Sequence, residues 1–213
     1  MKAKSIVLLS GGIDSSTALF WSKTKGCDTY ALTFKHGNWN KNEINAAKKL
    51  AKLAKVKKHI ILDANFLNEI QDLKSNYLSK KFPATYIPSR NTVFFGIASH
   101  YAEIYGINYI VTGHSFIDPF PDSKPTYIKS INYALFYGSW LGKKYKTKII
   151  MPFGTMDKPS ILKLALKLKV PLELTWSCHK NNKFACSKCN SCTSRLNAFE
   201  KVGIKDKIKY KSS

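Results

Sequence analysis

Residues 6–19 read Ile-Val-Leu-Leu-Ser-Gly-Gly-Ile-Asp-Ser-Ser-Thr-Ala-Leu, and this stretch decides the fold. Its four apolar residues at 6–9 predict a buried strand, and the segment from Asp14 onward predicts a helix. Glycines between them let the backbone approach an anion, and a helix N-terminus favours negative charge. A plain Ser or Asp cap is the alternative, but it needs one oxygen where three hydroxyls and a carboxylate crowd together.

This turn is similar to the Ser-Gly-Gly-x-Asp-Ser signature of the PP-loop ATP pyrophosphatases, and we call residues 10–16 the PP-loop. It lacks the Gly-Lys-Ser/Thr of the lysine-bearing P-loop. In that superfamily the loop holds the pyrophosphate end of ATP while a substrate oxygen attacks the α-phosphate. The resemblance implies a set of ATP-binding residues on the loop, its flanks and one later strand end: Leu9, Ser10, Gly11, Gly12, Ile13, Asp14, Ser15, Ser16, Thr17 and Gly113.

The chain has 213 residues, which fits one main domain with an appendage. We predict a catalytic domain over 1–174 and a metal-binding subdomain over 175–213. No stretch is long and apolar enough to span a bilayer, and residues 1–4 leave no room for a signal peptide before the first strand. We therefore expect a cytoplasmic protein without a membrane partner, in which cysteines indicate metal or chemistry before disulfides.

The formal net charge is +22, and nearly all of the positive charge is lysine spread along the chain. This spread is typical of a solvated surface, so we expect weak, salt-sensitive affinity for polyanions and no specific nucleic-acid function. Arg90 and Arg195 are the exceptions in this lysine-rich chain. Because a planar bidentate donor cannot be replaced by a point charge, both are candidates for geometric roles.

Apolar periodicity along the chain predicts alternating strands and helices. After the first strand we expect strands over 29–34, 58–62, 108–112 and 148–151, and helices over 43–55, 92–105, 126–140 and from Asp157 onward. Residues 72–88 predict a long loop. The pattern indicates an α/β fold with a doubly wound, mostly parallel five-stranded sheet, whose functional residues gather at the carboxyl ends of the strands.

Four cysteines fall within fifteen positions near the C-terminus, at Cys178, Cys186, Cys189 and Cys192. Their overlapping Cys-x2-Cys steps match a knuckle that wraps a tetrahedral ion, and four thiolates favour structural zinc. An iron–sulfur cluster is the main alternative. We expect His179 to be a neighbour of the cluster, a helix to begin near Arg195, and the tail over 205–213 to be frayed.

Taken together, these motifs resemble the 7-cyano-7-deazaguanine synthases, over nearly the whole chain. The resemblance rests on the PP-loop, the turn at 34–40, the four-cysteine tail with Arg195, and several short motifs along the chain: Pro88-Ser89-Arg90-Asn91, Thr112-Gly113, Pro121-Asp122, Met151-Pro152 and Asp157-Lys158.

The resemblance implies an ATP-dependent ligase that adenylates 7-carboxy-7-deazaguanine and converts it with ammonia, through the amide, to the nitrile. It implies ATP, Mg²⁺ and Zn²⁺, and a homodimer. The catalytic residues it implies are Asp14, Ser15, Arg90 and Lys158, with Asp14 carrying magnesium or fixing the loop. The substrate-binding residues it implies are Arg90, Asn91, Asp118 and Asp122.

The chain departs from the family pattern in the loop over 118–123, which is shorter and lacks a Ser-Gly-Tyr and a cysteine, and at Ser89, which replaces a glycine. This loop is a plausible wall of the base or amine pocket. A paralogue that transfers the adenylated acid to another amine, such as a protein N-terminus, therefore stays open. The positive charge keeps a second enzyme open, a tRNA-modifying PP-loop enzyme. The alternative without catalysis is a zinc-knuckle binding module on a degenerate nucleotide fold.

Overall fold

The computed structural model describes residues 2–36, 41–67, 86–180 and 183–211. Its centre is a five-stranded parallel sheet in the order β3-β2-β1-β4-β5. The strands are β1 (Lys4–Leu8), β2 (Asp28–Lys35), β3 (His59–Asp63), β4 (Tyr109–Val111) and β5 (Lys148–Ile150). The predicted α/β class and parallel five-stranded sheet are confirmed.

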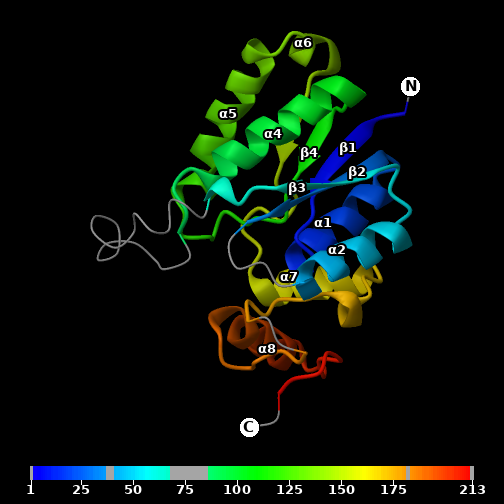
Figure 1. The fold of residues 1–213 in the computed structure, drawn as a ribbon, viewed down its shortest axis with the longest axis vertical. Coiled ribbons are helices and arrows are strands. Elements are labelled where there is room, and N and C mark those ends of the chain that lie inside the picture. Colours follow the sequence, from blue (N-terminus) through cyan, green and yellow to red (C-terminus); the bar gives the residue numbers. More distant parts are fainter. Residues whose placement is uncertain (1, 37–40, 68–85, 181–182, 212–213) are drawn as a thin grey trace.

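Helices cover both faces of this sheet (Figure 1). They are α1 (Ile13–Thr24), α2 (Lys41–Leu53), α4 (Arg90–Tyr105), α5 (Pro125–Gly138), α6 (Gly142–Tyr145), α7 (Lys158–Lys167) and α8 (Asn190–Val202). Short 3-10 turns lie at Pro121–Ser123 and Leu172–Leu174. No helix in the described ranges is long and apolar enough to cross a membrane.

Alternation along β1 assigns each helix to its face. Ile6 and Leu8 belong to a core cluster with Phe95 of α4, whereas Val7 packs in a second cluster with Leu19 of α1. Successive side chains of a strand point to opposite faces, so a run of apolar residues requires cover on both sides. This burial fixes the orientation of β1 and places the PP-loop at its carboxyl end.

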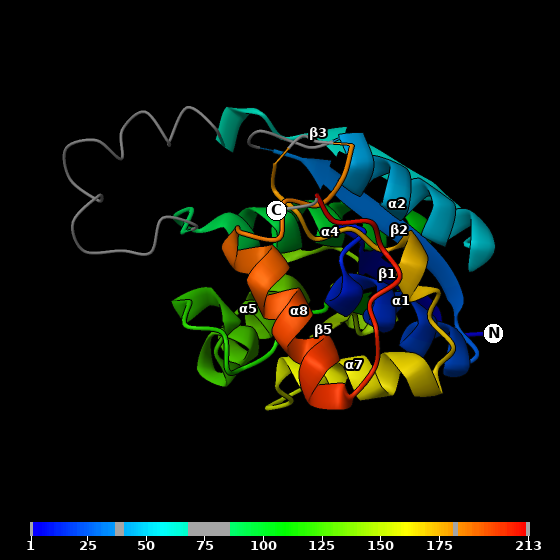
Figure 2. The same cartoon turned by 90° about the horizontal axis from the view of Figure 1, so that it is seen from below.

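The C-terminal part lies beside α7 and the start of α1 (Figure 2). A third apolar cluster joins Ile13 of α1 and Leu162 of α7 to Phe199 of α8. This packing brings the cysteine-bearing segment to the carboxyl-end side of the sheet. The domain boundary near residue 174 stays a prediction.

Two predictions about the C-terminal part are wrong. Helix α8 begins at Asn190, not near Arg195, because the last cysteine of the cluster already sits in its first turn. The tail is not frayed over its described residues, since Asp206 pairs with Arg195 and Ala185 forms a bridge with Tyr210. The predicted loop over 72–88 falls mostly outside the described residues, and the predicted helix over 126–140 is present as α5, followed by the short α6.

Candidate functional site

The PP-loop lies between β1 and α1, and Gly11 is held there by close backbone packing. Its φ is +88°, and a Cβ at this position would lie 2.5 Å from the carbonyl oxygen of Glu43. The amide of Trp176 also donates to the Gly11 carbonyl at 2.9 Å. Gly12 then precedes α1 without any side-chain cap. The first-turn amides of α1 are therefore available to an anion.

The hydroxyls around the PP-loop divide into two groups. Ser10 Oγ and Ser15 Oγ contact each other at 2.9 Å within the loop. The hydroxyls of Ser16 and Thr17 are buried and donate to backbone carbonyls of Gly12 and Ile13 at 2.6 and 2.7 Å. Ser15 Oγ also donates to the Gly12 carbonyl at 3.2 Å, and Ser10 Oγ accepts the amide of Gly12 at 3.3 Å. Ser16 and Thr17 stabilise the first turn, and the side chains of Leu9 and Ile13 are buried in apolar clusters.

Gly113, at the end of β4, packs against the same turn. A Cβ on Gly113 would lie 2.6 Å from the carbonyl carbon of Asp14 and 2.7 Å from the amide nitrogen of Ser15. Only a glycine permits this approach. The PP-loop therefore packs against α2 at Gly11, and the first turn of α1 packs against the end of β4 at Gly113.

Asp14 and Lys158 form an ion pair beside the PP-loop. Lys158 begins α7, whose N-cap Asp157 accepts the amide of Ser160 at 2.9 Å. The pair uses only Oδ2 of Asp14, and Oδ1 is buried without a hydrogen-bond partner. An unpaired carboxylate oxygen next to a phosphate-binding turn is a ligand that Mg²⁺ prefers. The residues therefore fit a magnesium ion at Asp14.

Arg90 lies at the centre of a cluster of charged side chains at the start of α4. Burial lowers the pKa of the guanidinium, while the carboxylates of Asp122 and Asp118 raise it. The same guanidinium contributes to lowering the pKa of His114, which also feels Asp14. The charges of the predicted Arg90, Asp118, Asp122 and Asp14 thus all act on the pKa of one histidine, after the larger effect of its burial.

His114 is a site residue that sequence reasoning missed. Its Nδ1 lies 2.7 Å from Thr112 Oγ1, which orients the ring at the end of β4. Burial, followed by the charge of Arg90, lowers the pKa of His114, so the ring is neutral near pH 7. Its position directly after a predicted strand was the available signal.

Asn91 is fixed by the 3-10 turn at Pro121–Ser123. Its backbone amide donates to Asp122 Oδ2 at 3.2 Å, and its side-chain Oδ1 is buried without a hydrogen-bond partner. Asp118 accepts the amide of Ser115 at 3.2 Å. Asp118 therefore organises its own loop, and Asp122 joins this loop to the start of α4.

The four cysteines form a compact group, and their sulfur atoms all lie within 4.8 Å of one another. The amides of Cys186 and Cys189 approach the sulfurs of Cys178 and Cys186, each at 3.3 Å. Tetrahedral zinc with Zn–S bonds of about 2.3 Å needs sulfurs about 3.8 Å apart, and Cys186 Sγ lies 3.9 Å from Cys192 Sγ. The donor set fits a structural metal ion.

Arg195 does not reach the nucleotide site. Its guanidinium is fully buried and forms a bidentate ion pair with Asp206 of the tail. Nε donates to Oδ2 at 2.6 Å, and Nη2 donates to Oδ1 at 3.0 Å. It also donates to Thr175 Oγ1 and to the carbonyl of Leu172. Arg195 has the geometric role that its residue type suggested, but that role is to join the tail to the chain around residue 175.

Comparison with known proteins identifies the family of this chain. A family model described as "Queuosine biosynthesis protein QueC" matches residues 4–203. The chain belongs to the QueC family. It is 37% identical to the 7-cyano-7-deazaguanine synthase of Thermoplasma volcanium, over 99% of this chain and 92% of that relative. It is 33% identical to the synthase of Nostoc punctiforme, over 97% of this chain and 99% of the relative. The family resemblance drawn from the motifs is confirmed.

Two solved structures share the overall fold of this QueC family member. NMN synthetase from Francisella tularensis aligns with a TM-score of 0.55 at 15% identity, over 96% of this chain and 79% of that one. A 4-thiouridine synthetase–RNA complex with bound ATP aligns with a TM-score of 0.56 at 19% identity, over 94% and 50%. At these identities the likeness supports the QueC chain's fold alone.

Proposed function

We propose that this chain adenylates 7-carboxy-7-deazaguanine with ATP and converts it with ammonia, through the amide, to 7-cyano-7-deazaguanine. The observation that carries the proposal is the meeting of two sites at the carboxyl edge of the sheet. One is the uncapped start of α1 next to Asp14 and Lys158, and the other is the Arg90 cluster. The first suits a triphosphate and the second suits a polar carboxylic acid. The relatives named above carry the name of this synthase.

The residues divide the work of the proposed reaction. Amides of the PP-loop and the hydroxyls of Ser10 and Ser15 hold the phosphates. Lys158 offsets negative charge as pyrophosphate leaves, and Arg90 can hold a carboxylate or phosphate through two parallel hydrogen bonds. Asp14 would hold Mg²⁺, which neutralises phosphate charge when bound. Asn91, Asp118 and Asp122 border the acid on the other side.

The product assay tests this function directly. The full chain is incubated with ATP, Mg²⁺, 7-carboxy-7-deazaguanine and ammonium, and products are identified by mass. We expect AMP together with the nitrile. Accumulation of acyl-adenylate or amide without nitrile would instead favour another amine acceptor. The altered loop over 118–123 is the structural reason to consider one. No AMP at all would contradict the proposal.

We also propose that the four cysteines bind zinc, which orders a segment with few large apolar side chains. Elemental analysis of the purified chain should find about one zinc per chain. Cys192→Ser should lower the zinc content several-fold, because three thiolates close the site poorly. Cys27→Ser is the matched control, since Cys27 lies outside the cluster, and it should keep its metal. Iron with visible absorbance would contradict zinc.

We also propose that the chain forms a homodimer, and a measurement of its mass in solution tests this.

A further inference from the structure

Glu43 lies at the rim of the PP-loop, in the first turn of α2. Its carbonyl oxygen is the atom closest to the position of a Cβ on Gly11, at 2.5 Å. The start of α2 is therefore in direct backbone contact with the turn that would bind the phosphates. Any ligand of that turn lies near the first residues of this helix.

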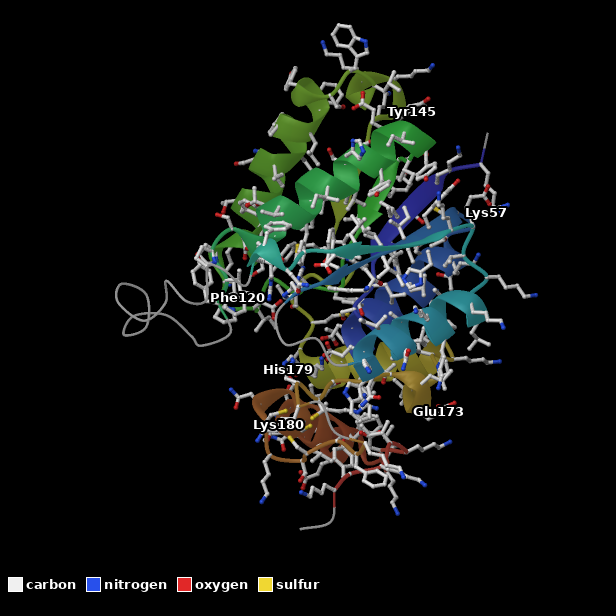
Figure 3. All side chains as sticks on the ribbon, viewed as in Figure 1. Lys57, Phe120, Tyr145, Glu173, His179 and Lys180 are labelled. Atoms are coloured by element: carbon white, nitrogen blue, oxygen red, sulfur yellow. The ribbon has the colours of Figure 1, made fainter. Side chains whose placement is uncertain are left out.

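The carboxyl group of Glu43 is enclosed between α2 and the C-terminal segment. Its side chain is 16% exposed, and the facing group is Nδ1 of His179, at 3.8 Å. Figure 3 shows His179 at the border between the cysteine-bearing part and the rest of the molecule. Within the described ranges no lysine or arginine forms an ion pair with Glu43. Among the residues that the structure describes, the carboxyl is therefore largely shielded from solvent and has His179 as its ion-pair neighbour.

The same space borders the Arg90 cluster. Burial, followed by the charge of Arg90, lowers the pKa of both His179 and His36. His36 follows β2 and also feels His179.

The proposed reaction needs a base, and the other titratable groups of the site serve poorly. Asp14 is paired with Lys158, and Asp118 and Asp122 accept the backbone amides of Ser115 and Asn91. Burial, followed by Arg90 and His179, lowers the pKa of His36 to about 4, and burial with Arg90 also lowers that of His114. Burial raises the pKa of Glu43 to about 7. A general base works best when its pKa lies near the working pH.

We infer that Glu43 is the general base of the amination step, accepting a proton from the amine that attacks the acyl-adenylate. This role rests on the proposed function. As the C–N bond forms, the C–O bond to AMP breaks and its electron pair stays on the AMP phosphate. The nitrogen loses one proton to the Glu43 carboxylate, which passes it to water before the next turnover.

Adenylation and amide formation can be measured separately. This distinguishes the role of Glu43 from the roles of the residues that bind ATP. Exchange of labelled pyrophosphate into ATP, with 7-carboxy-7-deazaguanine present, reports adenylation and needs no amine. Amide formation with ammonium reports the step assigned to Glu43. In Glu43→Gln we expect exchange within about twofold of the unaltered chain and amide formation at least about 100-fold slower. Glu200→Gln, an exposed carboxyl of α8, is the matched control and should change neither rate.

A pH profile supplies a second readout. At a constant concentration of free ammonia, amide formation by the unaltered chain should rise with pH through about 7 as Glu43 loses its proton. The rise should be absent in Glu43→Gln. With hydroxylamine in place of ammonia, the difference in rate between the unaltered chain and Glu43→Gln should be smaller. After attack, the protonated nitrogen of hydroxylamine loses its proton to water more readily than that of ammonia.

Each outcome is decisive. Normal amide formation by Glu43→Gln would overturn the role of Glu43, as would equal loss of exchange and amide formation, which would assign Glu43 to nucleotide binding. Absence of exchange in the unaltered chain would overturn the proposed function, and the role of Glu43 with it.

Discussion

Replacing Gly11 with alanine is expected to lower the free energy of unfolding by about 3 kcal/mol and to abolish pyrophosphate exchange. The backbone at Gly11 has φ +88°, which is costly for any residue with a Cβ. The new methyl group would also lie 2.5 Å from the Glu43 carbonyl oxygen and 2.9 Å from the Ala47 amide nitrogen. These are backbone atoms of α2, so relief requires the helix to move away from the PP-loop. Urea denaturation and the exchange assay measure the two effects.

Gly96→Ala is the matched control for this change. Gly96 lies inside α4, and a Cβ there would meet nothing within 4 Å. Alanine is favoured over glycine in a helix interior by about 1 kcal/mol, so this variant should be as stable as the unaltered chain or more stable. If Gly11→Ala had the same urea midpoint as the unaltered chain and kept pyrophosphate exchange, the close approach of α2 would not be needed to shape the PP-loop.

Replacing Arg195 with methionine is expected to cost about 3–5 kcal/mol of stability. The guanidinium is fully buried, and its partner Asp206 is only 3% exposed, so the variant leaves a carboxylate without its cation in the interior. It also removes the donors to Thr175 and Leu172. Urea denaturation measures the loss. In contrast, Asp28→Asn, which removes an exposed pair with Lys2, should cost at most about 1 kcal/mol.

The same pair gives stability a pH dependence with a definite sign. Burial alone raises the pKa of Asp206, but the hydrogen bonds and charge of Arg195 more than offset this and hold it below the usual 3.8. A lowered pKa stabilises the fold at pH values above the pKa of Asp206 in the unfolded chain. This contribution is lost as the pH falls through the pKa of Asp206 in the folded chain.

Equal loss of stability in Arg195→Met and Asp28→Asn at neutral pH would contradict a structural role for the Arg195–Asp206 pair.

Much of the fold followed from local sequence. Four apolar residues, two glycines and a helix start at 6–19 predicted β1, the PP-loop and α1, because burial on both faces and an anion-binding turn leave a local pattern. The four cysteines were equally plain, since their short spacing alone brings the thiols together. Conversely, the extent of α8 and the order of the tail depended on contacts with distant segments, and those predictions were wrong.

The sequence by itself determined the family, the parallel sheet and the cluster of four cysteines. Only the tertiary structure decided which charged groups stand free and which are paired. It assigned Arg195 to Asp206, and it set Glu43 beside Gly11 and His179, although these residues are far apart in the chain. Burial and charge partners set the protonation of a side chain, and both arise from segments that meet only when the chain folds.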